Sequence, residues 1–139
     1  MKQIKNISSI LTAFVLLSFS ITSCNKKTDP HVPPKMELNT AAGYTSGDAT
    51  LLHGDTIKVG VTVTKTEDDL KSYNVSSAFD GASTTTTFYN EVLSSAQYNG
   101  YSKETTIVTR NKAGIEKWTF AIVDRDGNIT QKTITLTVQ

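Results

Sequence analysis

Hydrophobic and polar residues alternate along most of the chain after residue 35, the period expected of half-buried β-strands. In the clearest case, residues 57–63, the apolar residues Ile57, Val59, Val61 and Val63 are separated by lysine, glycine and threonine. Residues 134–138 repeat the pattern, with apolar residues separated by threonines. Five further segments are predicted as strands on similar grounds: 36–38, 70–79, 84–89, 105–109 and 118–123.

Turn-forming residues separate several of these segments. Asp80-Gly81, 111–114 and 126–128 combine glycine with short polar side chains, which tolerate left-handed backbone and bond to neighbouring amides. Seven short strands with regular turns are typical of an all-β sandwich. Residues 91–97 are ambiguous between a single helical turn and a loop. Trp118 is assigned to the core because it shares the phase of the apolar residues that follow it.

Composition narrows the function classes. The chain has 139 residues, 14 Lys plus Arg and 13 Asp plus Glu, with a net charge of +1. This length suits one domain, and near-neutrality gives no electrostatic basis for nucleic-acid binding. The single cysteine and the two distant histidines, His31 and His53, disfavour a disulfide scaffold and a zinc centre.

Residues 1–23 have the pattern of a targeting segment. Lys2 and Lys5 precede an apolar run from Ile10 to Ile21. A membrane-spanning helix needs about 20 apolar residues, so this run is too short to span. It fits the hydrophobic region of a signal peptide.

The segment that follows identifies the kind of signal peptide. Ile21-Thr22-Ser23-Cys24 resembles the lipobox of bacterial lipoproteins, in which a branched apolar residue and two small residues precede a cysteine. The resemblance implies that Cys24 receives a diacylglycerol and becomes the mature N-terminus. Several acyl chains would hold the protein on a membrane, because each buried methylene contributes about 0.8 kcal/mol. The alternative is a plain secretory signal followed by an incidental cysteine.

A tether is expected after Cys24. Residues 25–34 contain all three prolines of the chain. Proline favours extended polyproline II geometry and cannot donate to a β-ladder, which disfavours an ordered strand here. Because the stretch after Cys24 is basic, the lipoprotein resemblance favours the periplasmic face of the outer membrane over the cell surface. The predicted organisation is a signal peptide at 1–23, a lipidated N-terminus and flexible tether at 24–38, and a β-domain at 39–139.

Three motifs mark the strands of the β-domain. Gly54–Ile57 opens the second strand, Ala113-Gly114 precedes the strand of Trp118, and 123–128 precedes the final Thr-rich strand. With these motifs the region 39–139 resembles the immunoglobulin-like (Ig-like) domains of bacterial surface and periplasmic lipoproteins. The resemblance implies an Ig-like antiparallel β-sandwich of about seven strands. The cysteine pair that joins the sheets of antibody domains is missing.

Two acidic loops would meet if the strand order is Ig-like. Glu67, Asp68 and Asp69 follow the second strand, and Asp124 and Asp126 lie in the last turn. In that topology both loops occupy one end of the sandwich, the end nearest the tether. Since Ca²⁺ takes six to eight oxygen ligands, a calcium site is one hypothesis. The alternative is that the carboxylates at 124 and 126 serve the hairpin turn.

Aromatic residues gather between 88 and 101. Tyr89, Tyr98 and Tyr101 could stack on sugar rings if they were exposed on one face, which makes a glycan site a second hypothesis. The alternative is that these rings pack in the core or cover a sheet edge. Asp55-Thr56-Ile57 also matches a short O-glycosylation tripeptide of some anaerobic Gram-negative bacteria, with Thr56 as the acceptor.

No sequence motif for catalysis is present, neither a nucleophile elbow nor a phosphate loop nor a zinc-binding helix. The expected function is a non-catalytic binding, adhesion or scaffolding module of the bacterial cell envelope. It would be anchored in a membrane through Cys24, would need no cofactor besides the hypothetical calcium, and would have an envelope protein or a glycan as its partner. A glycan-binding accessory lipoprotein is the alternative, and a hydrolase fragment is the third hypothesis.

Overall fold

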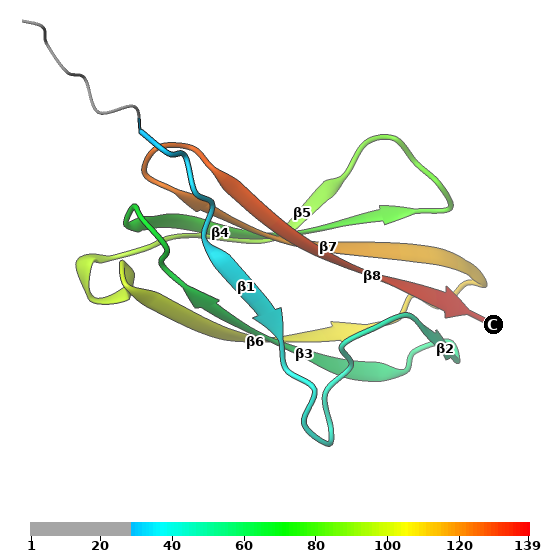
Figure 1. The fold of residues 1–139 in the computed structure, drawn as a ribbon. Helices are drawn as coiled ribbons and strands as arrows, with labels where there is room; N and C mark the ends of the chain where they lie inside the picture. The colour runs from blue at the N-terminus through cyan, green and yellow to red at the C-terminus, as the bar shows by residue number, and fades with distance from the viewer. Residues whose placement is uncertain (1–28) are drawn as a thin grey trace, which may run out of the picture.

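The part of the chain that the structure describes forms eight strands in two stacked sheets (Figure 1). The computed structural model describes residues 29–139. One sheet has the order β1-β3-β6 and the other the order β2-β8-β7-β4-β5. The strands are β1 (Lys35–Leu38), β2 (Ala49–Leu51), β3 (Thr56–Thr64), β4 (Leu70–Phe79), β5 (Thr86–Val92), β6 (Gly100–Val108), β7 (Gly114–Asp124) and β8 (Ile129–Val138).

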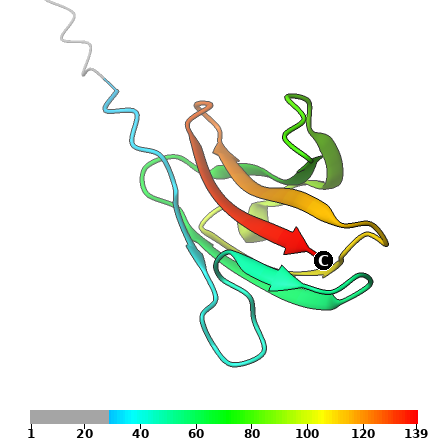
Figure 2. The ribbon, with the colours of Figure 1, turned by 90° about the vertical axis from the view of Figure 1, so that its right-hand side faces the viewer.

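The predicted Ig-like β-sandwich is confirmed. β1, β3 and β6 form one layer, and β4, β7 and β8 form the centre of the other, as strands A, B, E and C, F, G do in Ig domains (Figure 2). The strand count is eight rather than seven because β2 pairs in parallel with β8. β2 has only three residues, too few to show an alternating pattern.

Several boundaries differ from the predicted ones. β6 begins at Gly100, five residues before the predicted start, and pairs along its whole length with β3. The ambiguous segment continues β5 to Val92 and then makes a 3₁₀ turn at Ser95–Gln97. β1 pairs with β3 from Lys35 onward, so the sandwich includes residues that the predicted boundary at 39 assigned to the tether.

The core lies between the two sheets. Tyr73, Phe120 and Ile107 are fully buried, and Trp118 is 4% exposed, which confirms its assignment to the core. Burial of each large apolar side chain contributes about 1.5–3 kcal/mol. Phe79, at the end of β4, is 38% exposed, and Arg110 lies over its ring.

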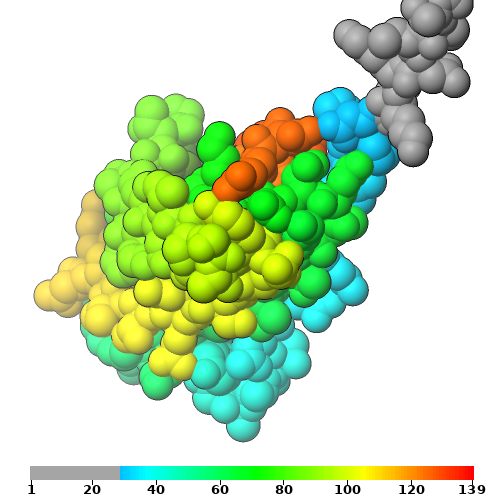
Figure 3. Space-filling view, turned by 90° about the vertical axis from the view of Figure 1, so that its left-hand side faces the viewer, coloured from blue at the N-terminus to red at the C-terminus, as the bar shows by residue number. Residues whose placement is uncertain are grey.

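The two ends of the sandwich carry different loops. Residues 29–34 run along the end that carries the β3–β4 loop and the β7–β8 turn (Figure 3). At the opposite end, Asp80 of the β4–β5 turn bonds to Arg110 and Ile115, and Gln139 bonds to Leu51. We call these the acidic end and the distal end. The tether therefore joins the body at the acidic end.

Candidate functional site

The two acidic loops meet at the acidic end, in the arrangement that the Ig-like order predicts. The backbone N–H of Arg125 in the β7–β8 turn donates to the Asp69 carbonyl of the β3–β4 loop at 2.9 Å. Asp29 belongs to two clusters of possible ligand atoms at this end. In one, carboxylate oxygens of Asp29, Glu67 and Asp68 lie within 4.8 Å of one another. In the other, Asp29 lies within the same distance of Asp126 and His31. Asp29 was not predicted as a site residue, since its position depends on the path of the chain past both loops.

Two of the five predicted calcium ligands already have hydrogen-bond or ion-pair partners within the protein. The buried Asp124 carboxylate accepts the backbone N–H of Asn128 at 2.8 Å and its side-chain amide at 3.0 Å. Asp124 therefore stabilises the hairpin, as the alternative hypothesis held. The Asp69 carboxylate pairs with Lys65 at 2.8 Å and lies 3.8 Å from Arg125. Both residues are therefore held in internal contacts.

The remaining carboxylates repel one another. The hydrogen bond that Asp126 shares with Asp29, together with the nearby charges of Asp68 and Asp29, raises the pKa of Asp126 to about 6. The same shared hydrogen bond lowers the pKa of Asp29. Among the described residues, one buried oxygen of Asp68 has no hydrogen-bond partner. A cation or a bound proton would relieve this repulsion.

The three predicted sugar-binding tyrosines do not form an exposed platform, which corrects that hypothesis. Tyr101 is 6% exposed and packs on Tyr73 with ring centroids 5.2 Å apart. Its hydroxyl and that of Tyr89 both donate to the same Glu91 oxygen at 2.6 Å. The reason is topological: β5 and β6 are edge strands of different sheets, and these side chains close the gap between them.

Glu91 is the shared hydrogen-bond acceptor of the side chains between β5 and β6. Besides the two tyrosines it accepts the side-chain amide of Gln97 at 3.1 Å, and Lys103 donates to the Tyr89 hydroxyl at 3.0 Å. The hydrogen bonds from Tyr101, Tyr89 and Gln97 hold the pKa of Glu91 at about 2. Such a satisfied network stabilises the sandwich edge.

Tyr98 lies apart from the other two tyrosines. The guanidinium of Arg125 sits 4.2 Å from its ring centroid, a cation–π contact. Tyr98 and Arg125 border a shallow hollow of about 370 Å³ that Lys71, Val92 and Leu93 complete.

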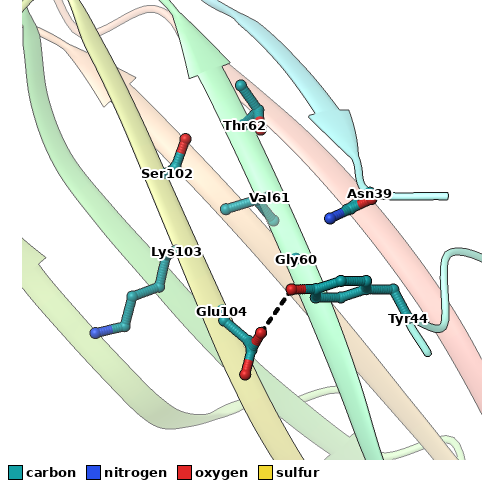
Figure 4. A pocket seen from close by; sticks show the side chains of 8 residues that line it. All are labelled: Asn39, Tyr44, Gly60, Val61, Thr62, Ser102, Lys103 and Glu104. Atoms are coloured by element: carbon teal, nitrogen blue, oxygen red, sulfur yellow. Dashed lines mark hydrogen bonds between the residues drawn. The ribbon is translucent and has the colours of Figure 1, made fainter. Parts of the chain in front are cut away.

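A second hollow, of about 230 Å³, lies on the outer face of the three-stranded sheet (Figure 4). Tyr44, from the loop between β1 and β2, crosses β3 at Gly60 and donates its hydroxyl to Glu104 at 2.7 Å. Thr62 and Ser102, which pair in register, lie to one side of the ring. Sequence reasoning missed Tyr44 because it lies in a loop, where alternation says nothing about the direction of a side chain.

Of the two predicted modification sites, Thr56 and Cys24, the structure describes only Thr56. Thr56 is exposed at the start of β3, so its hydroxyl is accessible for the predicted glycosylation. Cys24 lies outside the described residues. Within the described part, no helix has the length and apolar character needed to cross a membrane.

Comparison with known proteins supports the fold. No protein-family model and no curated protein matches the chain. A chitin-binding domain from Burkholderia pseudomallei matches with a TM-score of 0.51 at 7% identity, over 68% of this chain and 58% of that one. The β-glucosidase of Listeria innocua matches with a TM-score of 0.46 at 11% identity, over 75% of this chain and 16% of that one. Murine CRIg matches with a TM-score of 0.42 at 11% identity, over 78% of this chain and 99% of that one. This chain thus spans little more than half of the chitin-binding domain, and at 7% identity the likeness shows the fold alone.

Proposed function

We propose that this protein is a lipid-anchored binding module of the bacterial cell envelope that uses its Ig-like sandwich for adhesion or scaffolding rather than catalysis. The observation that carries the proposal is the lipobox-like sequence ending at Cys24, the only cysteine. Acyl chains on that residue would hold the tether at a membrane. The basic residues after Cys24 favour the periplasmic face of the outer membrane.

The path of the chain supports an oriented module. Because residues 29–34 join the body at the acidic end, the anchor would keep that end nearest the membrane and leave the distal end free. The distal end carries the exposed apolar side chains of Leu52, Val108 and Ile115, which are 63%, 60% and 50% exposed. A protein partner in the envelope would meet this end first.

Replacement of the anchoring thiol tests the proposal. We expect Cys24→Ser to abolish incorporation of labelled palmitate and to move the protein from the membrane fraction to the soluble fraction, because no acyl chain can attach. Ser23→Ala is the matched control, since it keeps a small residue before the cysteine and should stay lipidated. Equal palmitate labelling of Cys24→Ser and the parent would refute the anchored module.

Glycan binding is the second candidate function. The set of Tyr89, Tyr98 and Tyr101 does not support it, because Tyr101 is only 6% exposed and the three rings therefore form no shared exposed surface. The hollow beside Tyr44 supports it better, since an aromatic ring there lies next to hydroxyl, amide and carboxylate groups.

Calcium binding at the acidic end stays a prediction, now centred on Glu67, Asp68, Asp126 and Asp29. The folded-state pKa of Asp126, about 6, lies above its ordinary value of 3.8. Ionisation of Asp126 therefore costs stability as pH rises through this interval. We expect Asp126→Asn to raise the melting temperature at pH 7 and to leave it nearly unchanged at pH 3.

The Asp126→Asn variant also tests calcium binding. Millimolar Ca²⁺ should raise the melting temperature of the parent at pH 7 by about 2–5 °C, because a ligand that binds only the folded state stabilises it. Asp126→Asn should lose most of that increase, and Mg²⁺ should have a smaller effect because it needs stricter octahedral geometry. An unchanged melting temperature of the parent in millimolar Ca²⁺ would end the calcium hypothesis.

A further inference from the structure

We infer that the hollow beside Tyr44 on the three-stranded sheet is a binding site for one residue of a neutral glycan. This inference rests on the proposed role as a binding module and names a ligand class and a site for it. The site consists of the Tyr44 ring, the Asn39 amide, the hydroxyls of Thr62 and Ser102, and the Glu104 carboxylate (Figure 4).

The strand beneath Tyr44 leaves space for its ring. A Cβ at Gly60 would lie 2.9 Å from the Asn39 Cβ, closer than real Cβ atoms approach, and 3.0 Å from a ring carbon of Tyr44, tighter than most real contacts. Glycine at this position in β3 therefore lets the ring rest directly on the backbone. The other outward residues of β3, such as Lys58 and Thr62, carry side chains that would prevent this.

Backbone hydrogen bonds hold the loop that supplies the ring. The N–H groups of Asn39 and Thr45 donate to the carbonyls of Gly60 and Lys58, each at 2.8 Å. Between these two points the Asn39 side chain accepts the N–H of Ala41 at 2.9 Å. The loop therefore follows β3 on both sides of Tyr44, which reduces the entropy that the site would lose on binding.

The far end of the ring is held as well. The Tyr44 hydroxyl donates to one Glu104 oxygen at 2.7 Å, while Lys58 pairs with the other at 3.1 Å. The Glu104 hydrogen bond raises the pKa of Tyr44. The ring thus has contacts at both ends before any ligand arrives.

The chemistry of this surface suits a sugar. A pyranose presents C–H groups on its faces and hydroxyls around its rim, so it needs an aromatic ring beside polar groups. Tyr44 supplies the ring, and the exposed Thr62 and Ser102 supply hydroxyls that donate and accept. Asn39 and Glu104 add an amide and a carboxylate, which complete the polar rim around the hollow.

Charge and size specify the ligand further. Two charged side chains line the hollow: Glu104 pairs with Lys58, and Lys103 points away from the Tyr44 ring and donates to the Tyr89 hydroxyl (Figure 4). Among the described residues, no free positive charge therefore faces the ring to attract an acidic sugar. The volume of about 230 Å³ is below the roughly 300–1,000 Å³ of pockets for drug-sized ligands. It therefore suits one sugar ring within a longer, otherwise exposed chain.

Calorimetric titration of the full protein tests the inference. The probes are the methyl glycosides of glucose, galactose, mannose and N-acetylglucosamine and their short oligomers, in a detergent without a sugar headgroup. We expect at least one to bind in the millimolar to micromolar range. Tyr44→Ala should weaken that binding about tenfold, corresponding to about 1.4 kcal/mol, Tyr44→Phe about two- to threefold, and Thr62→Val by a similar small factor.

The controls separate the site from the rest of the protein. Tyr98→Ala, at the other hollow, should leave the affinity unchanged, and circular dichroism confirms that each variant is folded. Absence of binding by every neutral glycoside overturns the inference, as does binding that survives Tyr44→Ala and Thr62→Val. Neither result bears on the anchored module, which depends on Cys24 and is tested separately.

Discussion

Glu116→Ala is expected to destabilise the protein by about 3–5 kcal/mol, because two hydrogen-bond donors would lose a buried charged acceptor, at about 1–3 kcal/mol each. Glu116 is fully buried. Its carboxylate accepts the backbone N–H of Arg110 at 2.8 Å and the indole N–H of Trp118 at 3.0 Å, and lies 3.7 Å from the Arg110 guanidinium. Alanine would leave both donors without this acceptor and would open a cavity under Trp118.

Urea denaturation of three variants measures this effect and its origin. Glu116→Gln keeps one acceptor oxygen but places an amide N–H₂ toward a donor, so we expect an intermediate loss of about 1–3 kcal/mol. Glu37→Ala removes an exposed carboxylate that pairs with Lys35 at 3.3 Å, and should cost less than about 1 kcal/mol. A loss below 1 kcal/mol for Glu116→Ala would show that the buried carboxylate does not organise this end.

Gly114→Ala should cost about 2–4 kcal/mol. Gly114 begins β7 with φ of +144°, a conformation that residues with a side chain rarely adopt. A Cβ there would also overlap the Arg110 guanidinium and the Asp80 carboxylate. These two groups form the ion pair that joins the β4–β5 and β6–β7 turns and holds the pKa of Asp80 at about 2. The substitution therefore combines backbone strain with the loss of that pair.

Gly81→Ala separates the two contributions. Gly81 also has a positive φ, +79°, but nothing lies within 4 Å of its Cβ position. Its replacement should cost only the backbone term, about 1 kcal/mol. The excess for Gly114→Ala should shrink in an Asp80→Ala background, because the obstructing carboxylate is gone. Equal costs for the two glycine substitutions would contradict this explanation.

Both predictions concern the distal end, which the proposed orientation leaves free. The Asp80–Arg110–Glu116 contacts hold the β4–β5 turn, the β6–β7 connection and the start of β7 in one arrangement. A binding surface there would gain from this rigidity, since less conformational entropy is lost on association. The glycan hollow instead lies on the outer face of the three-stranded sheet.

Alternation of residue types predicted most of the strands because a period of two is a local property. Ile57–Val63 and Ile134–Val138 show it within one strand, and the buried positions there agree with it. The short β2 and the early start of β6 were missed, since their pairing depends on β8 and β3 rather than on their own residues. The Ig-like order, once inferred, also placed the two acidic loops together.

Side-chain partners could not be predicted in the same way. Tyr101 is buried beside Glu91, and Tyr44 lies across Gly60. Both outcomes depend on which strand edge or loop lies nearby in space. The chain's pattern thus predicted the class of fold, which the structure confirms, and a lipid anchor, which stays a prediction. The packing of the two sheets determined which polar groups are occupied and which remain open to a ligand.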